Sequence, residues 1–303
     1  MISGSSPPPI QTRKPARASR RSTAEPSYSS ALIGRRQLLG LSLAPLVALA
    51  GCADFRAHYP GPDILFVATP EQVGVEMLRM ASVGPEDTVF DLGSGDGRLV
   101  IAAARQFGAR GVGVEIDAPL VQTSRESAQT SGVADRVTFL WQDIFITDLH
   151  SATVVAIYLR DDVNLKLRPK LLGELAPGSR LVSHDFAMGD WTADRVQRFQ
   201  GPSRIHTLYF WVIPGHAEGI WQMRLGERDA RLTLTQRYQT LDGGLSADGR
   251  EQILTDAKMI GPRITFTAGG QAFSGRVTAD AIEDGTVRAS QGPPAPWSAR
   301  RLP

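Results

Sequence analysis

An aspartate and three glycines alternate with other residues in the stretch VFDLGSGDGRLVIAA, at Asp91, Gly93, Gly95 and Gly97. Because glycine has no Cβ, such a loop lets a ligand lie against bare backbone, and we expect the turn to present free N–H groups. The nearest alternative is the dinucleotide fingerprint G-x-G-x-x-G, whose loop receives a pyrophosphate. Here the third glycine comes one residue earlier, and the Asp91 carboxylate would repel a pyrophosphate. The stretch therefore predicts a site for a positively charged ligand and disfavours a dinucleotide oxidoreductase.

Two further acids follow apolar stretches, Glu115 at the end of GVGVE and Asp143 at the end of VTFLWQD. A carboxylate at the end of the second strand can accept hydrogen bonds from both hydroxyls of a ribose. Asp143 can accept one from an adenine amino group while the next backbone N–H donates to the ring. A cation, an unphosphorylated ribose and an adenine together describe S-adenosylmethionine. The predicted cofactor-binding residues are Asp91, Gly93, Ser94, Gly95, Gly97, Glu115, Ile116, Asp143 and Ile144.

The elements that must position these side chains alternate between strand and helix. The strands are apolar almost throughout, which favours an α/β fold with a doubly wound, mostly parallel sheet covered on both faces. Thr69, Pro70 and Gln72 form a predicted capping box at the first helix. The predicted strands span 88–93, 111–116, 137–143, 153–159 and 179–186, and the helices 69–84, 97–108, 119–132 and 163–178, with further strands in 192–213.

Apolar and polar residues alternate with a period of two in the last part of the chain, which is typical of antiparallel strands. The turn AGGQ, residues 268–271, predicts a hairpin there. We therefore expect a small C-terminal antiparallel β domain, a meander or barrel. The predicted domains are a leader at 1–52, a cofactor-binding domain at 60–214 and the β domain at 215–303.

The motif D-x-G-x-G-x-G, with Glu115 and Asp143 at the following strand ends, resembles class I, seven-strand S-adenosylmethionine-dependent methyltransferases, which have a Rossmann-like fold. The resemblance covers about residues 65–213. TPEQVGVEML ahead of the glycine loop resembles the seven-strand protein lysine methyltransferases, including those that modify the ATP synthase c subunit. IYLRDD replaces the Asn-Pro-Pro-Tyr-like motif of many amide and exocyclic-nitrogen methyltransferases, which disfavours adenine or glutamine as acceptor. The resemblance implies methyl transfer to a protein lysine, with a small-molecule acceptor as the alternative.

A lysine acceptor must lose a proton before it can attack a methyl group. With a pKa of about 10.4, neutralising the amine at pH 7 costs about 4.6 kcal/mol. Tyr158, His184 and Asp185 follow or end the fourth and fifth predicted strands, and we predict them as the catalytic residues. Asp161 and Asp162 are instead expected to cap the next helix. No metal is expected, since Cys52 is the only cysteine.

The leader combines Arg35, Arg36, an apolar run at 38–50 and the sequence LAGC, which ends at Cys52. The run is shorter than the ~20 residues that a membrane-spanning helix needs. It resembles a twin-arginine export signal with a lipoprotein cleavage box, in which Cys52 would be lipidated. This predicts a membrane-associated protein. Because S-adenosylmethionine is made in the cytosol, a cytoplasmic enzyme and a lipid-anchored, non-catalytic binding protein remain as alternatives.

Charge is distributed unevenly along the chain. Residues 1–37 hold seven Lys or Arg and one acid, whereas residues 38–303 hold 26 basic and 30 acidic residues. The folded part shows no basic stripe that would follow a phosphate backbone. Nucleic acid is therefore not expected as its partner, and the sequence does not fix the oligomeric state.

Overall fold

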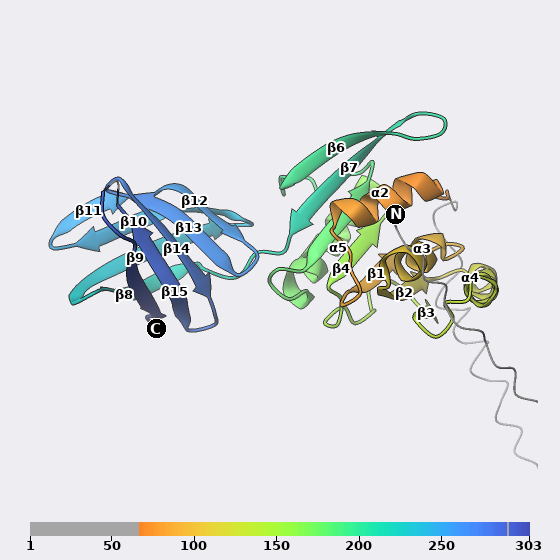
Figure 1. Cartoon of the computed structure of the whole chain (residues 1–303), viewed down its shortest axis with the longest axis horizontal. Helices are drawn as coiled ribbons and strands as arrows, with labels where there is room; N and C mark the ends of the chain where they lie inside the picture. The colour runs from red at the N-terminus through yellow and green to blue at the C-terminus, as the bar shows by residue number, and fades with distance from the viewer. Residues whose placement is uncertain (1–66, 290) are drawn as a thin grey trace, which may run out of the picture. The chain divides into compact units, whose positions relative to one another are not determined.

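The computed structural model describes residues 67–289 and 291–303 (Figure 1). The predicted leader, with Arg35, Arg36 and Cys52, lies outside the described residues. Among the described helices, none has the length and apolar character needed to cross a membrane.

The first sheet has seven strands in the order β3-β2-β1-β4-β5-β7-β6. The first five strands in this order pair in parallel, while β7 runs antiparallel to both of its neighbours. This confirms the mostly parallel α/β sheet that the alternation of elements predicts. The strands are β1 (Thr88–Leu92), β2 (Arg110–Glu115), β3 (Val137–Trp141), β4 (Val154–Ile157), β5 (Arg180–His184), β6 (Arg195–Gln200) and β7 (Ile205–Val212).

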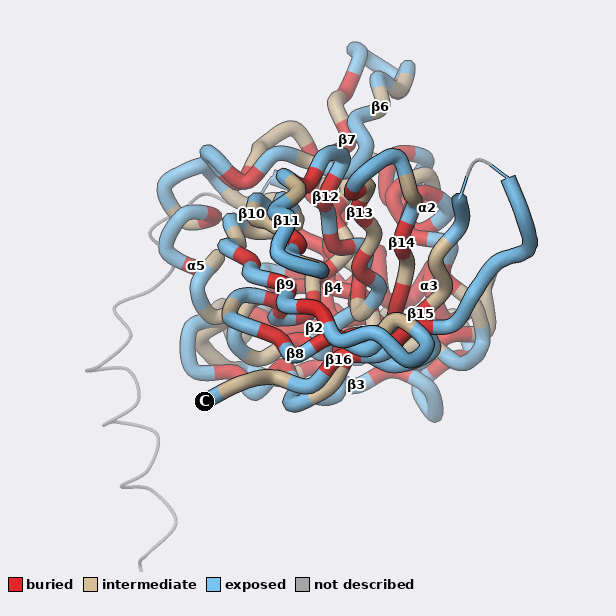
Figure 2. Tube along the Cα trace, turned by 90° about the vertical axis from the view of Figure 1, so that its left-hand side faces the viewer, coloured by how far each residue is buried: buried red, intermediate tan, exposed pale blue. Residues whose placement is uncertain are grey.

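Helices cover both faces of this sheet, as Figure 1 shows, and the buried positions in Figure 2 follow the strands. Val89 of β1 packs in a core with α2 and α3, whereas Phe90 and Leu92 belong to a second core with α5. Val89 and Phe90 face opposite ways because neighbouring strand residues point to opposite faces. The helices are α2 (Glu71–Met80), α3 (Arg98–Phe107), α4 (Ala118–Thr130) and α5 (Asp161–Glu174).

The predicted capping box at α2 is wrong. Pro70 occupies the N-cap position, no side chain caps the helix, and the helix ends at Met80. Thr69 Oγ1 instead lies 3.1 Å from His184 Nδ1, so a tertiary contact has replaced the local one. Similarly, Asp161 and Asp162 do not cap α5. They form its first turn, where a negative charge interacts favourably with the helix dipole.

The second sheet is antiparallel, with the order β11-β10-β12-β13-β14-β15-β16-β8-β9 and an additional β9–β10 pairing that closes it into a barrel. The predicted hairpin is present: Ala268 pairs with Gln271, and Gly269 and Gly270 take φ of 53° and 73°. Two positive φ angles in a two-residue hairpin loop require glycine-like residues. The strands are β8 (Gly219–Leu225), β9 (Arg228–Arg237), β10 (Thr240–Ala247), β11 (Arg250–Ile253), β12 (Thr255–Ile260), β13 (Arg263–Ala268), β14 (Gln271–Val277), β15 (Ala281–Arg288) and β16 (Ala295–Arg301).

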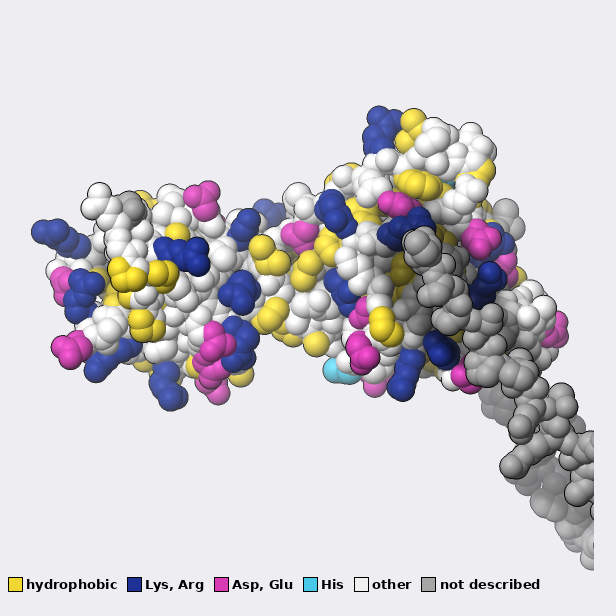
Figure 3. Space-filling model, viewed as in Figure 1, with side chains coloured by type: hydrophobic (Ala, Val, Ile, Leu, Met, Phe, Trp, Pro, Cys, Tyr) yellow, Lys and Arg dark blue, Asp and Glu magenta, His cyan; other side chains and the backbone are white. Residues whose placement is uncertain are grey.

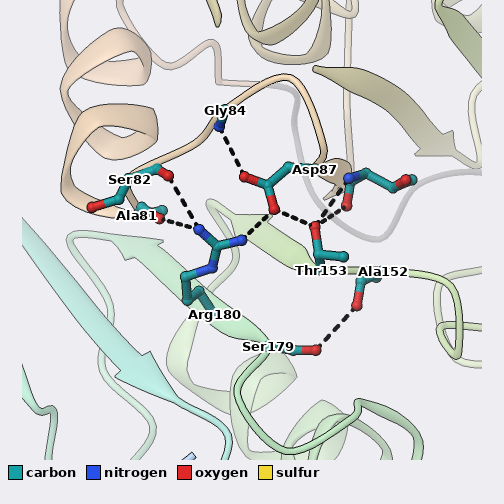
Figure 4. A network of polar contacts seen from close by, with 9 residues as sticks. Ala81, Ser82, Gly84, Asp87, Ala152, Thr153, Ser179 and Arg180 are labelled. Atoms are coloured by element: carbon teal, nitrogen blue, oxygen red, sulfur yellow. Dashed lines mark hydrogen bonds and ion pairs between the residues drawn. The ribbon is translucent and has the colours of Figure 1, made fainter. Parts of the chain in front are cut away.

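A polar network ties together the amino ends of β1, β4 and β5 (Figure 4). Asp87 forms an ion pair with Arg180 and accepts hydrogen bonds from Thr153 Oγ1 at 2.7 Å and Gly84 N at 2.8 Å. Burial raises the pKa of Asp87, but these hydrogen bonds and the Arg180 charge lower it by more. The network fixes one end of the sheet. On the face shown in Figure 3, basic and acidic side chains are interspersed.

Candidate active site

The carboxyl ends of the parallel strands meet at one edge of the first sheet. Leu92 pairs with Val114 on one side and Ile157 on the other, and Ile157 pairs with Ser183. Glu115 pairs with Trp141. This register brings the predicted site residues, which lie at or beside these positions, to successive strand ends along the same edge. These residues therefore lie at or just beyond the carboxyl ends of the parallel strands.

The loop after β1 depends on its three glycines, since Gly93, Gly95 and Gly97 have φ of 82°, 53° and 79°. These conformations are strained for residues with a Cβ. The Val114 carbonyl accepts hydrogen bonds from Gly93 N and Ser94 N at 2.8 and 3.0 Å, and Ser94 O accepts one from Gly97 N at 2.9 Å. The expectation of free N–H groups is therefore wrong at these positions. The loop folds back on β2, so these groups are not available to a phosphate.

Glu115 closes this loop from the end of β2. Its Oε2 accepts a hydrogen bond from Gly95 N at 2.8 Å, and its Oε1 accepts from Ile116 N at 2.9 Å and Asp117 N at 3.0 Å. The side chain is buried. Three backbone donors therefore hold the carboxylate in one orientation at the sheet edge, where the predicted ribose would be bound.

Asp91, at the same edge of the first sheet, is a carboxyl group buried beside other acids. Only 7% of its surface is exposed, and burial raises the pKa of its carboxyl well above the ordinary value, as do the negative charges of Glu115 and Asp96. An ionised carboxylate in such surroundings is costly unless a cation compensates it. Asp91 lines a cavity together with Ser94 and Tyr158. The Ser94 hydroxyl is buried and has no hydrogen-bond partner among the described residues. The buried carboxyl of Asp91 thus favours a cationic ligand in this cavity.

Asp143 lies two residues beyond β3. Its Oδ1 accepts a hydrogen bond from Phe145 N at 2.8 Å, and its carbonyl accepts one from Thr147 Oγ1 at 2.8 Å. Ile144 follows and packs against the core beneath the sheet edge. Sequence reasoning missed Trp141, whose Nε1 donates to the Ile116 carbonyl at 2.8 Å. The available signal was a tryptophan two residues before the acid.

The support beneath the glycine loop was also missed. A Cβ at Gly113 would lie 2.5 Å from Phe139 Cδ1, and one at Gly97 would lie 2.6 Å from Phe139 Cε1. Ser124 Oγ of α4 donates to the Gly95 carbonyl at 2.9 Å. Gly113 therefore permits the close packing of β2 against Phe139, and the same phenyl ring lies against Gly97 of the glycine loop.

The three predicted catalytic residues form a second cluster beside the cavity. The rings of Tyr158 and His184 stack with centroids 3.9 Å apart. His184 is fully buried, and its Nε2 lies 2.7 Å from His206 Nδ1 and 3.3 Å from Asp185 Oδ2. Burial lowers the pKa of His184 to about 4, against the opposing effect of Asp185. His184 is therefore neutral at pH 7. No sequence pattern pointed to His206, which reaches this cluster from β7.

Asp185 is held in a strained backbone conformation, with φ of 61°. Its Oδ1 accepts a hydrogen bond from Thr207 N at 2.8 Å, and its Oδ2 pairs with the Arg204 guanidinium. Burial raises the pKa of Asp185, but the hydrogen bonds and charges of Arg204, Thr207 and His184 lower it overall. Asp185 is thus ionised at neutral pH and lies next to two histidines.

Comparison with known proteins places this site in a family. Residues 91–195 match the family described as ANTKMT methyltransferase domain. A protein-lysine N-methyltransferase of Saccharolobus islandicus (strain REY15A) is 39% identical over 156 residues, which cover 51% of this chain and 97% of that protein. The chain belongs to the protein-lysine N-methyltransferase family.

Two further similarities concern the same part of this methyltransferase. The adenine nucleotide translocase lysine N-methyltransferase of Mus musculus is 33% identical over 146 residues, and the match spans 48% of this chain and 61% of that relative. A solved structure, the RNA methyltransferase from Salinibacter ruber in complex with S-adenosyl-L-homocysteine, is 50% identical, covering 50% of this chain and 96% of that one, with a TM-score of 0.48. The family match supports S-adenosylmethionine as the cofactor of this methyltransferase. The family match ends before β8.

Proposed function

We propose that this methyltransferase transfers the methyl group of S-adenosylmethionine to the side-chain amine of a lysine in a protein. The observation that carries the proposal is the 39% identity to a protein-lysine N-methyltransferase over 97% of that relative's length. The shared fold alone would not select an acceptor, because one fold hosts many chemistries.

The cofactor supplies an electrophilic methyl group on a positively charged sulfur. Asp91 is the residue whose buried negative charge would compensate that cation. Its neighbours Glu115 and Asp96 are also acidic and raise its pKa, so the cofactor would supply the positive charge that favours its ionised form. The oriented carboxylate of Glu115 would accept a ribose hydroxyl at Oε2, which has one backbone donor against the two at Oε1. Asp143 would accept from the adenine amino group, with Ile116 and Ile144 beside it, and the three loop glycines would allow close approach.

The acceptor amine must reach the methyl group in line and without its proton. Positioning two reacting groups supplies a large part of the rate in such displacements. Tyr158 lines the cavity next to Asp91 and Gly93, so it borders the end of the site where the sulfur would lie. Removing the ammonium proton at pH 7 costs about 4.6 kcal/mol, which the protein must offset locally.

The test uses the full-length chain and tritiated S-adenosylmethionine, with protein and RNA extracted from cells that lack this chain. We expect label in the protein fraction that survives nuclease, is released by protease and is recovered as methyl-lysine after hydrolysis. Asp91→Asn should abolish the label. Label only in RNA or in small molecules would overturn the lysine proposal, and cofactor binding without any transfer would favour a non-catalytic binding protein.

We also infer that the leader associates this protein with a membrane. The order of Arg35, Arg36, the apolar run and Cys52 in the sequence supports this. Labelling cells with a palmitate analogue should tag the full-length chain and spare a Cys52→Ser variant. Recovery of the full-length chain only in the soluble fraction would refute membrane association.

A further inference from the structure

A buried hydrogen-bonded row of side chains leads away from the cavity beside Asp91. Thr69 lines that cavity, and its hydroxyl lies 3.1 Å from His184 Nδ1. On the other side of the same ring, His184 Nε2 lies 2.7 Å from His206 Nδ1. The row therefore connects three separate parts of the chain: the segment before α2, the end of β5 and β7. We propose that Thr69, His184 and His206 form the route by which the acceptor amine loses its proton; this inference rests on the proposed function.

Burying His184 and His206 is unfavourable for the free energy of folding if they serve only to fill the core. Both are buried, and His206 Nε2 has no hydrogen-bond partner among the described residues. A buried polar atom without a partner costs about 1–3 kcal/mol. A Cβ at Gly201 would lie 2.5 Å from His206 Cδ2, so the His206 ring is packed closely in place. An apolar residue pair would fill the same space without this cost.

The charges around the pair suit a proton in transit. Asp185 Oδ2 lies 3.3 Å from His184 Nε2 and 3.6 Å from His206 Nδ1, so it stabilises positive charge on either ring. Arg204 pairs with the same oxygen and opposes the accumulation of that charge, while the Tyr158 ring stacks on His184 from the cavity side. Asp185, His206, Arg204 and Tyr158 thus surround His184, whose ring is neutral at pH 7 and whose burial disfavours the charged form, so it can carry the proton only in passing.

The transfer balances as a shift of one positive charge. In the starting tautomers, the Thr69 hydroxyl donates to His184 Nδ1, and His184 Nε2–H donates to His206 Nδ1. An N–H bond of the lysine ammonium breaks and its proton moves to Thr69 Oγ1, whose own proton moves to His184 Nδ1. The proton on His184 Nε2 moves to His206 Nδ1. The lysine is left as a neutral amine with a lone pair, and His206 is left as an imidazolium. Its Nδ1 proton then moves to the ionised carboxylate of Asp185, whose Oδ2 lies 3.6 Å away and whose side chain is partly exposed, and from there to water.

A kinetic experiment on the full-length chain separates this route from a structural role. The readout is the initial rate of methyl-lysine formation in protein extract from cells lacking the chain, from pH 7 to pH 10. His184→Gln and His206→Gln should slow the reaction by about 100-fold at pH 7, within the range of general-base catalysis. The deficit should shrink steadily toward pH 10, where much of a lysine with pKa about 10.4 is already neutral.

Variants of Thr69 and His150, together with calorimetry, accompany these histidine variants. Thr69→Val removes the hydroxyl and should reproduce the pH-dependent loss, while Thr69→Ser should restore the rate. His150→Gln alters an exposed histidine that pairs with Asp148 at 2.6 Å, before β4 at the other end of the sheet, and should have no effect. Calorimetry should give the same S-adenosylmethionine affinity for all variants.

Several results would overturn the inference. A loss that is equal at every pH, or one explained by weaker cofactor binding, would make the histidines structural. Stoichiometric zinc in the purified chain would assign His184, Asp185 and His206 to a metal site instead. If Thr69→Val methylates lysine as fast as the wild type, the proton route is refuted and the proposed function is not. If the wild type methylates no lysine, the proposed function itself is refuted.

Discussion

Replacing Asp91 with asparagine should have opposite effects on stability and on cofactor binding. Asp91 is buried, and its pKa is raised by burial and by Glu115 and Asp96. An acid whose pKa is higher in the folded state binds more protons when folded, so its ionisation destabilises the fold as pH rises above about 3.9. Asp91→Asn removes this effect. The free energy of unfolding without cofactor should therefore increase at pH 7 and depend less steeply on pH.

The same change removes the negative partner of the cofactor's cation. Truncating one member of a buried charge pair at an interface typically costs about 2–5 kcal/mol, which raises Kd by about 30-fold to several thousand-fold. Calorimetry with S-adenosylmethionine measures this loss, and denaturant titration measures the stability. A variant that binds within about threefold of the wild type, a difference under 1 kcal/mol, would refute the assignment of Asp91.

Asp87→Asn is the matched control, because Asp87 immediately precedes β1, at the opposite end of the strand that holds Asp91. Its carboxylate pairs with Arg180 and accepts hydrogen bonds from Thr153 and Gly84, so its pKa is lowered and its charge stabilises the fold. Losing a hydrogen bond to a charged group costs about 2 kcal/mol. The control should thus lose stability and keep its cofactor affinity, the reverse of Asp91→Asn. Identical behaviour of the two variants would refute the distinction between the ends of the sheet.

Three further predictions concern packing and pH. Gly97→Ala places a Cβ 2.6 Å from Phe139 Cε1 at a positive φ, which alone costs about 1–2 kcal/mol, and should weaken both stability and cofactor binding; unchanged unfolding would contradict this. The pKa of His184 falls from 6.5 to about 4 on folding, so the folded state binds fewer protons at this residue than the unfolded state. The free energy of unfolding of the wild type should therefore decrease by up to about 3 kcal/mol as pH falls from 6.5 to 4. Denaturant titration of His184→Gln should not show this contribution. Gly285→Ala places a Cβ 2.1 Å from the Trp297 carbonyl and should disrupt the β barrel while calorimetry still shows normal cofactor binding.

The alternation of apolar segments was sufficient to predict both sheets. Strand residues such as Val89 and Phe90 need burial on opposite faces, and a mostly parallel sheet covered by helices provides it. The loop glycines were equally readable, because a positive φ at three alternate positions excludes most other residues. Local stereochemistry and hydrophobic burial act on neighbouring residues, so a sequence displays them directly.

The cofactor acids were predicted from their strand ends, and the structure brings Asp91 and Glu115 together at one edge. The predicted free N–H groups of the loop were wrong, since the Val114 carbonyl accepts from two of them. The capping role of Thr69 was wrong for a similar reason: its hydroxyl contacts His184, 115 residues away in the chain. In both cases a residue on a distant strand, Val114 of β2 or His184 of β5, supplies a partner that the sequence did not indicate.

The order of strands and helices, the glycine turn and the acids at the strand ends were all readable in the unfolded chain, because they follow from backbone stereochemistry and the period of apolar residues. Folding was needed to bring Thr69, His184 and His206 into one buried row, and to place Phe139 beneath Gly97 and Gly113. Those contacts depend on the register and crossing of distant elements, and no local pattern records which side chains will meet.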